Sequence, residues 1–172
     1  MHRYIAWLVL IAVLAGCTGD AHPVVKVGVV APFEGRGRLL GYEVLRAVKL
    51  AAADANARHD FGRYRVLVVA YNDDLDMATA ARQAKALAAD ADVVGVVGPC
   101  TVETVAGALP VLAAAGVPAM PLERTGSAEG DFEGGAAEAE RAAGALLRAL
   151  AATISEDGEP SRAGVARSLG AP

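Results

Sequence analysis

The sequence predicts an α/β fold: a doubly wound, mostly parallel sheet of the Rossmann-like kind, followed by a helical carboxyl-terminal tail. Short runs of β-branched residues alternate with amphipathic helical patterns between residues 24 and 120. The runs are apolar almost without interruption, which is typical of strands buried on both faces of a parallel sheet. Strands and helices that alternate in this way form α/β sheets with right-handed crossovers. The length of 172 residues is that of one ordinary domain.

The first strand and helix are expected at 24–31 and 39–57. The stretch "VVKVGVVA" is a near-continuous branched run and therefore predicts a buried strand. After a glycine-containing loop, apolar residues recur at the spacing of one helical face, which indicates an amphipathic helix. These residues are Leu40, Val44, Val48, Ala51 and Ala55.

The remaining elements continue the alternation. The second helix, which Asp76 can cap, has an apolar side made of Met77, Ala81, Ala84 and Leu87. A last short helix follows Ser161, which is a suitable N-cap. The other elements are expected at 64–71 (strand), 92–98 (strand), 101–115 (helix), 117–120 (strand) and 136–154 (helix).

Residues 1–16 are identified as a bacterial lipoprotein signal peptide. The stretch "MHRYIAWLVLIAVLAGC" has a basic residue near its start and then an apolar run that is short for a membrane-spanning helix. Its end, "LAGC", resembles a lipobox, whose cysteine carries a diacylglycerol after the signal is cut. We therefore expect a lipid on Cys17, a lipid-anchored tether over 17–23, and a location outside the cytoplasm.

Composition and residue types exclude several function classes. The formal net charge is −4 and the basic residues are scattered, whereas nucleic-acid binding needs clustered Lys and Arg. No pair among the 3 His and 2 Cys lies at the spacing of zinc ligands, so no metal is expected. We interpret Cys100 as a small loop residue, because no base is available to activate it. No enzymatic activity is expected.

Two local patterns admit an alternative interpretation. Gly35, Gly37 and Gly41 form a GxGxxxG after the first strand, which superficially suits a dinucleotide phosphate loop. Pro32 and Glu34 disturb the tight turn that such a loop needs, so we expect no cofactor. An acidic cluster resembles part of a calcium loop but lacks its glycine and distal glutamate, which favours a solvated turn and helix cap. The cluster comprises Asn72, Asp73, Asp74 and Asp76.

The candidate binding site is the carboxyl edge of the predicted sheet, where open α/β sheets bind ligands. The third strand ends at Gly98-Pro99, and the next helix begins near Thr101. The free N–H groups and the positive dipole end of that helix can receive a carboxylate or another anion. Thr101 has a second interpretation, as the helix N-cap alone, because both roles need the same hydroxyl in the same place.

Five stretches occur in a characteristic order: "KVGVVAPFEG", "GYEVLRAVKLAAADANA", "VVAYNDD", "VVGVVGP" and "AGVPAMP". Together they resemble the amino-terminal lobe of type I periplasmic binding proteins, nearest to the leucine/isoleucine/valine-binding group. The resemblance covers about residues 24–127 and rests on the joint order of the stretches. It implies a solute-binding lobe, an amino acid or similar small polar solute as ligand, and an ABC permease as partner.

The resemblance also implies site residues. Thr101 matches the first ligand-binding hydroxyl, and Val102 falls where a second hydroxyl is common. Thr125 matches the threonine of the last loop, and Leu40 falls at an apolar or aromatic wall of the pocket. The sequence departs from the family because Val102 cannot donate a hydrogen bond and "LERT" brings two charges where small residues are usual.

The family has a second lobe that closes on the solute and supplies the other half of the pocket. Residues 128–172 are expected to form a flexible loop and a helical tail, similar to the helix pair near the carboxyl terminus of such receptors. The chain is then a solute-binding protein that lacks most of the second lobe. The alternatives are a single-lobe sensor, a scaffold or a degenerate remnant without transport activity, and, for the tail, an unrelated alanine-rich helix.

Labelled fatty acid should enter the wild-type chain and keep it in the membrane fraction, since acyl chains contribute about 0.8 kcal/mol per buried CH₂. Cys17→Ser should abolish the label and either release the protein or leave it unprocessed. Cys100→Ser is the matched control and should be labelled like the wild type. A wild-type chain that takes up no label would contradict the lipid anchor.

Overall fold

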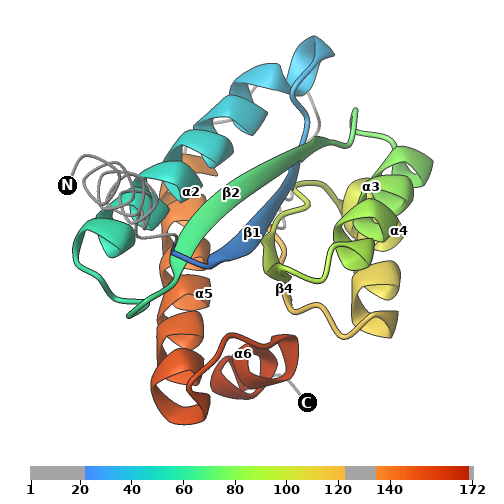
Figure 1. Cartoon of the computed structure of the whole chain (residues 1–172). Helices are drawn as coiled ribbons and strands as arrows, with labels where there is room; N and C mark the ends of the chain where they lie inside the picture. The colour runs from blue at the N-terminus through green and yellow to red at the C-terminus, as the bar shows by residue number, and fades with distance from the viewer. Residues whose placement is uncertain (1–21, 123–134, 171–172) are drawn as a thin grey trace, which may run out of the picture.

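The computed structural model describes residues 22–122 and 135–170 (Figure 1). The helices and strands alternate as the sequence predicts, with a short 3-10 turn, η2, added before the first helix. The N-cap predictions are confirmed, because Asp76 accepts a hydrogen bond from the Thr79 N–H and Ser161 accepts one from the Gly164 N–H. The elements are β1 (Val24–Ala31), η2 (Gly35–Gly37), α2 (Arg38–Ala57), β2 (Arg65–Asn72), α3 (Met77–Ala89), β3 (Val93–Val97), α4 (Val102–Ala114), β4 (Ala119–Met120), α5 (Gly135–Asp157) and α6 (Arg162–Ser168).

The strands described form one parallel sheet in the order β2-β1-β3-β4, which confirms the predicted fold class. β1 is central, and Val27, Val29 and Val30 have 0% exposed surface. Its side chains alternate between two cores, because Val27 and Val29 pack on one face of the sheet and Val30 on the other. The continuous apolar run of this strand therefore reflects burial on both faces.

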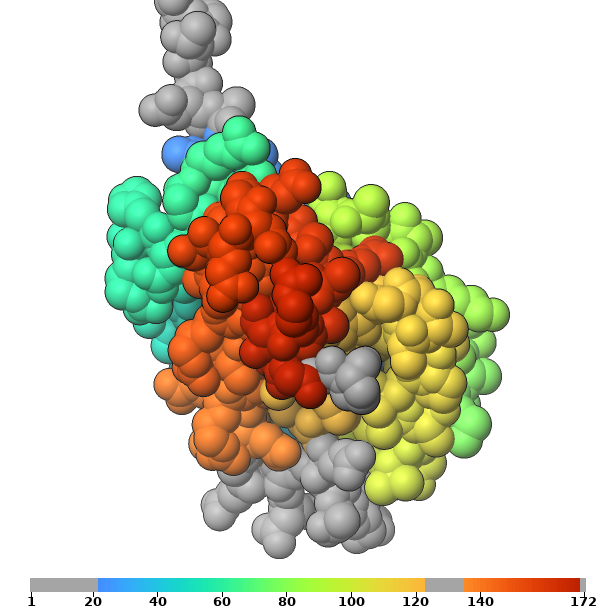
Figure 2. All heavy atoms as spheres, turned by 90° about the horizontal axis from the view of Figure 1, so that it is seen from below, coloured from blue at the N-terminus to red at the C-terminus, as the bar shows by residue number. Residues whose placement is uncertain are grey.

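Helices cover both faces of the sheet. α2 and α5 pack together on one face, and α3 and α4 pack together on the other (Figure 1). Seen from below, the α5–α6 segment lies between α2 and α4 (Figure 2). In the core under α2 and α5, Leu146 and Leu150 of α5 have 0% exposed surface. Within the described ranges, no helix is long and apolar enough to cross a membrane.

A bulge in β3 shapes the contact between the sheet and α5. The pairing of β1 with β3 shifts between Lys26 and Val27, so that one residue of β3 is extra. Gly95 lies at this shift, and a Cβ built on it would lie 2.5 Å from Cδ1 of Leu146. The absence of a side chain at Gly95 therefore makes room for Leu146 against the sheet.

The apolar side predicted for α3 is partly wrong. The residues of α3 that are buried are Ala80, Ala84 and Leu87, whereas Met77 is 51% exposed. Met77 is the first residue of the helix, and its backbone carbonyl lies where a Cβ on Gly107 of α4 would be. The first turn of α3 therefore approaches α4 closely through its backbone, and about half of the Met77 surface stays exposed.

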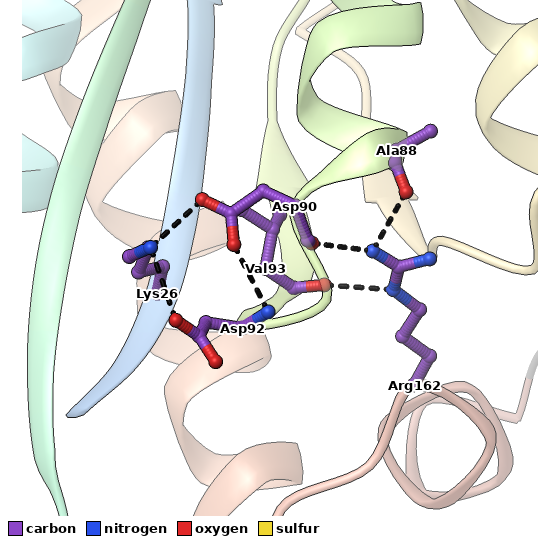
Figure 3. A network of polar contacts seen from close by, with 6 residues as sticks. All are labelled: Lys26, Ala88, Asp90, Asp92, Val93 and Arg162. Carbon is purple, nitrogen blue, oxygen red and sulfur yellow. Dashed lines mark hydrogen bonds and ion pairs between the residues drawn. The ribbon is translucent and has the colours of Figure 1, made fainter. Parts of the chain in front are cut away.

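At the amino edge of the sheet, ion pairs hold the turn between α3 and β3 (Figure 3). Lys26 Nζ lies 2.8 Å from an oxygen of Asp90 and 3.1 Å from an oxygen of Asp92. The hydrogen bond from Lys26 lowers the pKa of the Asp90 carboxyl. Asp90 also accepts a hydrogen bond from the Asp92 N–H at 3.1 Å, so the turn is tied both to β1 and to itself.

Arg162 binds the other side of the same turn (Figure 3). It is the first residue of α6, and its guanidinium donates hydrogen bonds to the carbonyl oxygens of Val93 at 2.8 Å, Asp90 at 2.7 Å and Ala88 at 3.1 Å. A planar guanidinium can satisfy several acceptors at once. Arg162 thereby connects α6 to residues about seventy positions earlier in the chain.

Arg162→Met should lower the free energy of unfolding by about 2–4 kcal/mol, because carbonyl oxygens at the turn would lose a charged donor. Urea denaturation at pH 7.5 measures the change. Arg167→Met is the matched control on the same helix, since Arg167 makes only an exposed ion pair with Asp157. Its loss should cost less than about 1 kcal/mol. Equal effects of the two substitutions would contradict the role assigned to Arg162.

Candidate functional site

The carboxyl ends of the strands meet at one edge of the sheet, because the strands are parallel. The loops after β1 and β2 are joined there: the Phe33 N–H donates to Oδ1 of Asn72 at 2.8 Å. The Asn72 amide in turn donates to Asp74 at 2.8 Å. Gly41 allows α2 to start close to this loop, since a Cβ would lie 1.9 Å from the Pro32 carbonyl oxygen. Packing thus explains one glycine of the GxGxxxG pattern.

The loop after β3 is held by backbone bonds. Gly98, which precedes a cis peptide bond to Pro99, has φ +93. A side chain at Gly98 would collide with the Val30 carbonyl, 2.1 Å from the Cβ position, so only glycine fits here. The Gly98 N–H donates to the Met120 carbonyl, and the Leu122 N–H donates to the Pro99 carbonyl, both at 2.9 Å. The loops after β3 and β4 are therefore fixed relative to one another.

Thr101 is the N-cap of α4 and forms a capping box with Thr104. The Thr104 N–H donates to the Thr101 hydroxyl at 3.3 Å, and the Thr101 N–H donates to the Thr104 hydroxyl at 3.2 Å. The predicted capping role is confirmed. The N–H groups of Val102 and Glu103 have no acceptor among residues 22–122 and 135–170. The start of α4 therefore retains free donors at the carboxyl edge.

The other residues implied as ligand contacts lie in different environments. Leu40 is 2% exposed and packs in the core under α2 and α5, while Val102 is 59% exposed at the start of α4. Thr125 lies outside the described residues, as do Cys17 and the charged pair of "LERT". The structure thus brings Thr101 and Val102 to the carboxyl edge and places Leu40 in the core beside it.

Two exposed apolar side chains at this edge were missed by the sequence analysis. Leu39 is 62% exposed and Tyr42 is 57% exposed, and both lie in the first turns of α2. The Tyr42 ring lies 5.8 Å from the ring of Phe33, centroid to centroid. The sequence did contain a signal for this pair: Leu39 and Tyr42 are three residues apart and lie on a different side of the helix from the buried Leu40. Both lie in the helix that follows β1, at the carboxyl edge of the sheet.

Asp73 is a buried carboxylate at the end of β2, and its assignment to a solvated turn is wrong. Its side chain has 0% exposed surface, and one oxygen accepts the Leu75 N–H at 3.0 Å. Within 22–122 and 135–170 Oδ2 has no hydrogen-bond partner, although the nearby Thr104 hydroxyl lowers the pKa of Asp73 slightly. The Asp73 N–H still pairs with the Ala31 carbonyl of β1, which directs the side chain inward. Burial raises the pKa of Asp73 to about 6, and the neighbouring charge of Asp74 adds to the rise.

The rest of the acidic cluster is used locally. Asp76 caps α3, and hydrogen bonds from Thr79 lower the pKa of its carboxyl. Cys100, interpreted from the sequence as a small loop residue, lies in the loop after β3 and is fully buried, with Sγ 3.8 Å from the Val30 carbonyl oxygen. In the part of the chain that the structure describes, no three His, Cys, Asp or Glu side chains are grouped as metal ligands. The chemistry available at this edge is therefore hydrogen bonding and apolar contact.

Comparisons with known proteins agree with this geometry. A family model described as "Periplasmic binding protein" matches residues 24–139. No curated protein matches the chain. Similar solved structures include a possible leucine/isoleucine/valine-binding protein from Rhodopirellula baltica, at 22% identity and TM-score 0.55, with 59% of this chain and 28% of that chain covered. A branched-chain amino acid ABC transporter protein from Rhodospirillum rubrum is 18% identical, at TM-score 0.56, over 72% of this chain and 47% of that one.

A type 1 periplasmic binding protein from Bordetella pertussis is also similar, at 24% identity and TM-score 0.52, over 56% of this chain and 26% of that one. These TM-scores, at such low identities, show a shared fold alone. The chain spans between 26% and 47% of the length of these three proteins. It therefore corresponds to part of each of them.

The pKa of Asp73 predicts a pH dependence of stability. A folded-state pKa of about 6, above the ordinary value of 3.8, means that the protonated carboxyl favours folding. This contribution is fully present below about pH 3.8, is lost as the pH rises through about 6, and amounts to about 2–3 kcal/mol. Asp73→Asn should therefore unfold at higher urea concentration than the wild type at pH 7.5, and the difference should vanish near pH 4.

Urea denaturation of both proteins between pH 4 and pH 8 measures this difference. Asp74→Asn is the matched control, because Asp74 is the exposed neighbour and asparagine tolerates its φ of 54. The control should keep most of the wild-type pH dependence. A constant difference between the Asp73→Asn variant and the wild type at every pH would show that Asp73 does not titrate in this range.

Proposed function

The chain belongs to the periplasmic binding protein family, and we propose that it is an extracytoplasmic solute-binding protein of an ABC importer, anchored to a bacterial membrane through a lipid on Cys17. The proposed solute is an amino acid or a similar small polar molecule with a carboxylate. The supporting observation is the start of α4, where Thr101 and free N–H groups stand at the carboxyl edge of the sheet. Helix starts at this position are suited to anions.

Other side chains at this edge fit such a solute. Leu39 and Tyr42, early in α2, offer exposed apolar surface at the same edge of the sheet, which suits an aliphatic or other apolar side chain. Thr101 is partly buried, so a hydrogen bond from its hydroxyl is less screened by water than one at a fully exposed site. Val102 adds apolar contact in place of a second hydroxyl. Thr125 is part of the proposal as the contact from the last loop.

A second candidate function is a single-lobe sensor or scaffold without transport activity. The observation that favours it is the packing of α5, because Leu146 and Leu150 are fully buried in the core of this same lobe. Solute receptors gain affinity by enclosing the ligand on most sides, and a lobe of this size offers one wall. The genes beside this one distinguish the two functions: permease and ATPase genes favour transport, and a receptor kinase gene favours sensing.

Titration of the purified protein with leucine, valine and a panel of polar solutes should give dissociation constants weaker than micromolar. A few exposed hydrogen bonds at about 0.5–1.5 kcal/mol each cannot easily offset the freedom lost on association. Amide NMR shifts at millimolar solute would detect such binding at Thr101 to Thr104. Thr101→Asp should abolish these shifts, because aspartate is a good N-cap but repels a carboxylate.

Two further variants separate binding from capping. Thr101→Ser keeps the hydroxyl and should retain both binding and stability, whereas Thr101→Val should lower the free energy of unfolding by about 1 kcal/mol through loss of the cap. Solute shifts that persist in a folded Thr101→Asp variant would contradict a carboxylate site at Thr101. Micromolar or tighter binding by a monomer would show that this chain builds the second wall of the pocket and would favour transport.

A further inference from the structure

β2 is an edge strand: within the described sheet, it lies at one end of the order β2-β1-β3-β4 and pairs with β1 alone. Figure 1 views the sheet from this edge: β2 is the foremost strand, with α2 on one side, α3 and α4 on the other, and none of the described helices in front of it. Leu67 is 45% exposed and Ala70 is also exposed, in agreement with this view.

The outward backbone groups of β2 are those of its even-numbered residues. The Arg65 N–H donates to the Pro23 carbonyl and the Asp73 N–H donates to the Ala31 carbonyl, so odd-numbered residues face β1. Backbone groups of successive strand residues point to opposite sides. The even-numbered Val66 is already paired, because the Asn56 side chain donates to its carbonyl at 2.8 Å and accepts its N–H at 2.9 Å.

Among the described residues, Val68, Ala70 and Asn72 are therefore the outward residues whose backbone N–H and C=O groups are left for another strand. β2 has eight residues, no proline, and a single charge, Arg65, at its start. These are the features of an edge that is not protected against strand addition. The opposite edge of the described sheet, β4, has only two residues and offers no comparable surface.

We propose that β2 is a homodimer interface, at which β2 pairs antiparallel with β2 of a second copy of this chain. Centred on Val69, the pairing places Val68 of each copy opposite Ala70 of the other, so that each such pair exchanges both N–H···O=C bonds. Asn56 remains on Val66 and limits the pairing at that end. The two sheets then form one continuous sheet across the twofold axis.

Charge favours a second copy in this orientation. The amino end of β2 carries the exposed Arg63 and Arg65, and its carboxyl end is followed by the exposed Asp74 and Asp76. Antiparallel pairing brings the arginines of each copy to the aspartates of the other, whereas parallel pairing would bring like charges together. The proposal does not depend on the solute or on the function proposed above.

Sedimentation equilibrium of the purified protein tests the proposal, with a dimer expected at micromolar concentrations and 0.15 M salt. Ala70→Pro removes an outward N–H that no neighbour within the described sheet uses, and should raise the dimer dissociation constant at least about tenfold with the helix content unchanged. Ala70→Ser is the matched control, since it keeps the N–H, and should leave the dissociation constant within about twofold.

Arg65→Glu tests the charge pairing without a proline in the strand. It should raise the dissociation constant and remove most of its dependence on salt, whereas Arg148→Glu, on exposed α5 surface, should do neither. Amide hydrogen exchange at Val68 and Ala70 should slow with increasing protein concentration. The proposal would be overturned if the wild-type protein stayed monomeric at about 100 times the micromolar concentrations at which a dimer is expected. It would also be overturned if the Ala70→Pro and Arg65→Glu variants folded and still dimerised like the wild type.

Discussion

The structure depends on the burial of α5 against the sheet. β1 and β3 carry branched side chains on both faces, so a face without a helix would expose a continuous apolar surface to water. Each fully buried Leu or Val side chain contributes about 1.5–3 kcal/mol, and Leu146 and Leu150 of α5 are among those with no exposed surface. Gly95 makes this approach of Leu146 possible. The carboxyl-terminal residues thus complete a core that the amino-terminal residues begin.

The same packing positions the candidate site. α2 and α5 cover one face of the sheet and α3 and α4 cover the other, and the carboxyl ends of the parallel strands, with the loops that follow them, lie at one edge. Hydrogen bonds between loops, from Phe33 to Asn72 and from Gly98 to Met120, fix the loops against each other. The start of α4 therefore stands on a rigid platform, which lowers the ordering cost of any contact that Thr101 makes.

Two surfaces of this lobe combine structural order with backbone groups that have no partner among the described residues. At the carboxyl edge, these are the N–H groups of Val102 and Glu103 at the start of α4. At the β2 edge, the outward backbone groups of Val68 and Ala70 come after Val66, whose backbone is already hydrogen-bonded to the Asn56 side chain. The first surface suits a small anion and the second suits a strand, because hydrogen-bond geometry differs between a helix start and a strand edge.

The sequence alone determined the order of strands and helices, the N-caps Asp76 and Ser161, and the edge at which the candidate site lies. These follow from periodicity, capping chemistry and parallel topology, which act between residues close in sequence or through a general rule. Tertiary structure alone decided that Asp73 is buried and that Met77 is exposed. It also decided that Arg162 binds carbonyls about seventy residues away. Such features depend on which distant segments pack against a residue, and a local pattern carries no information on that.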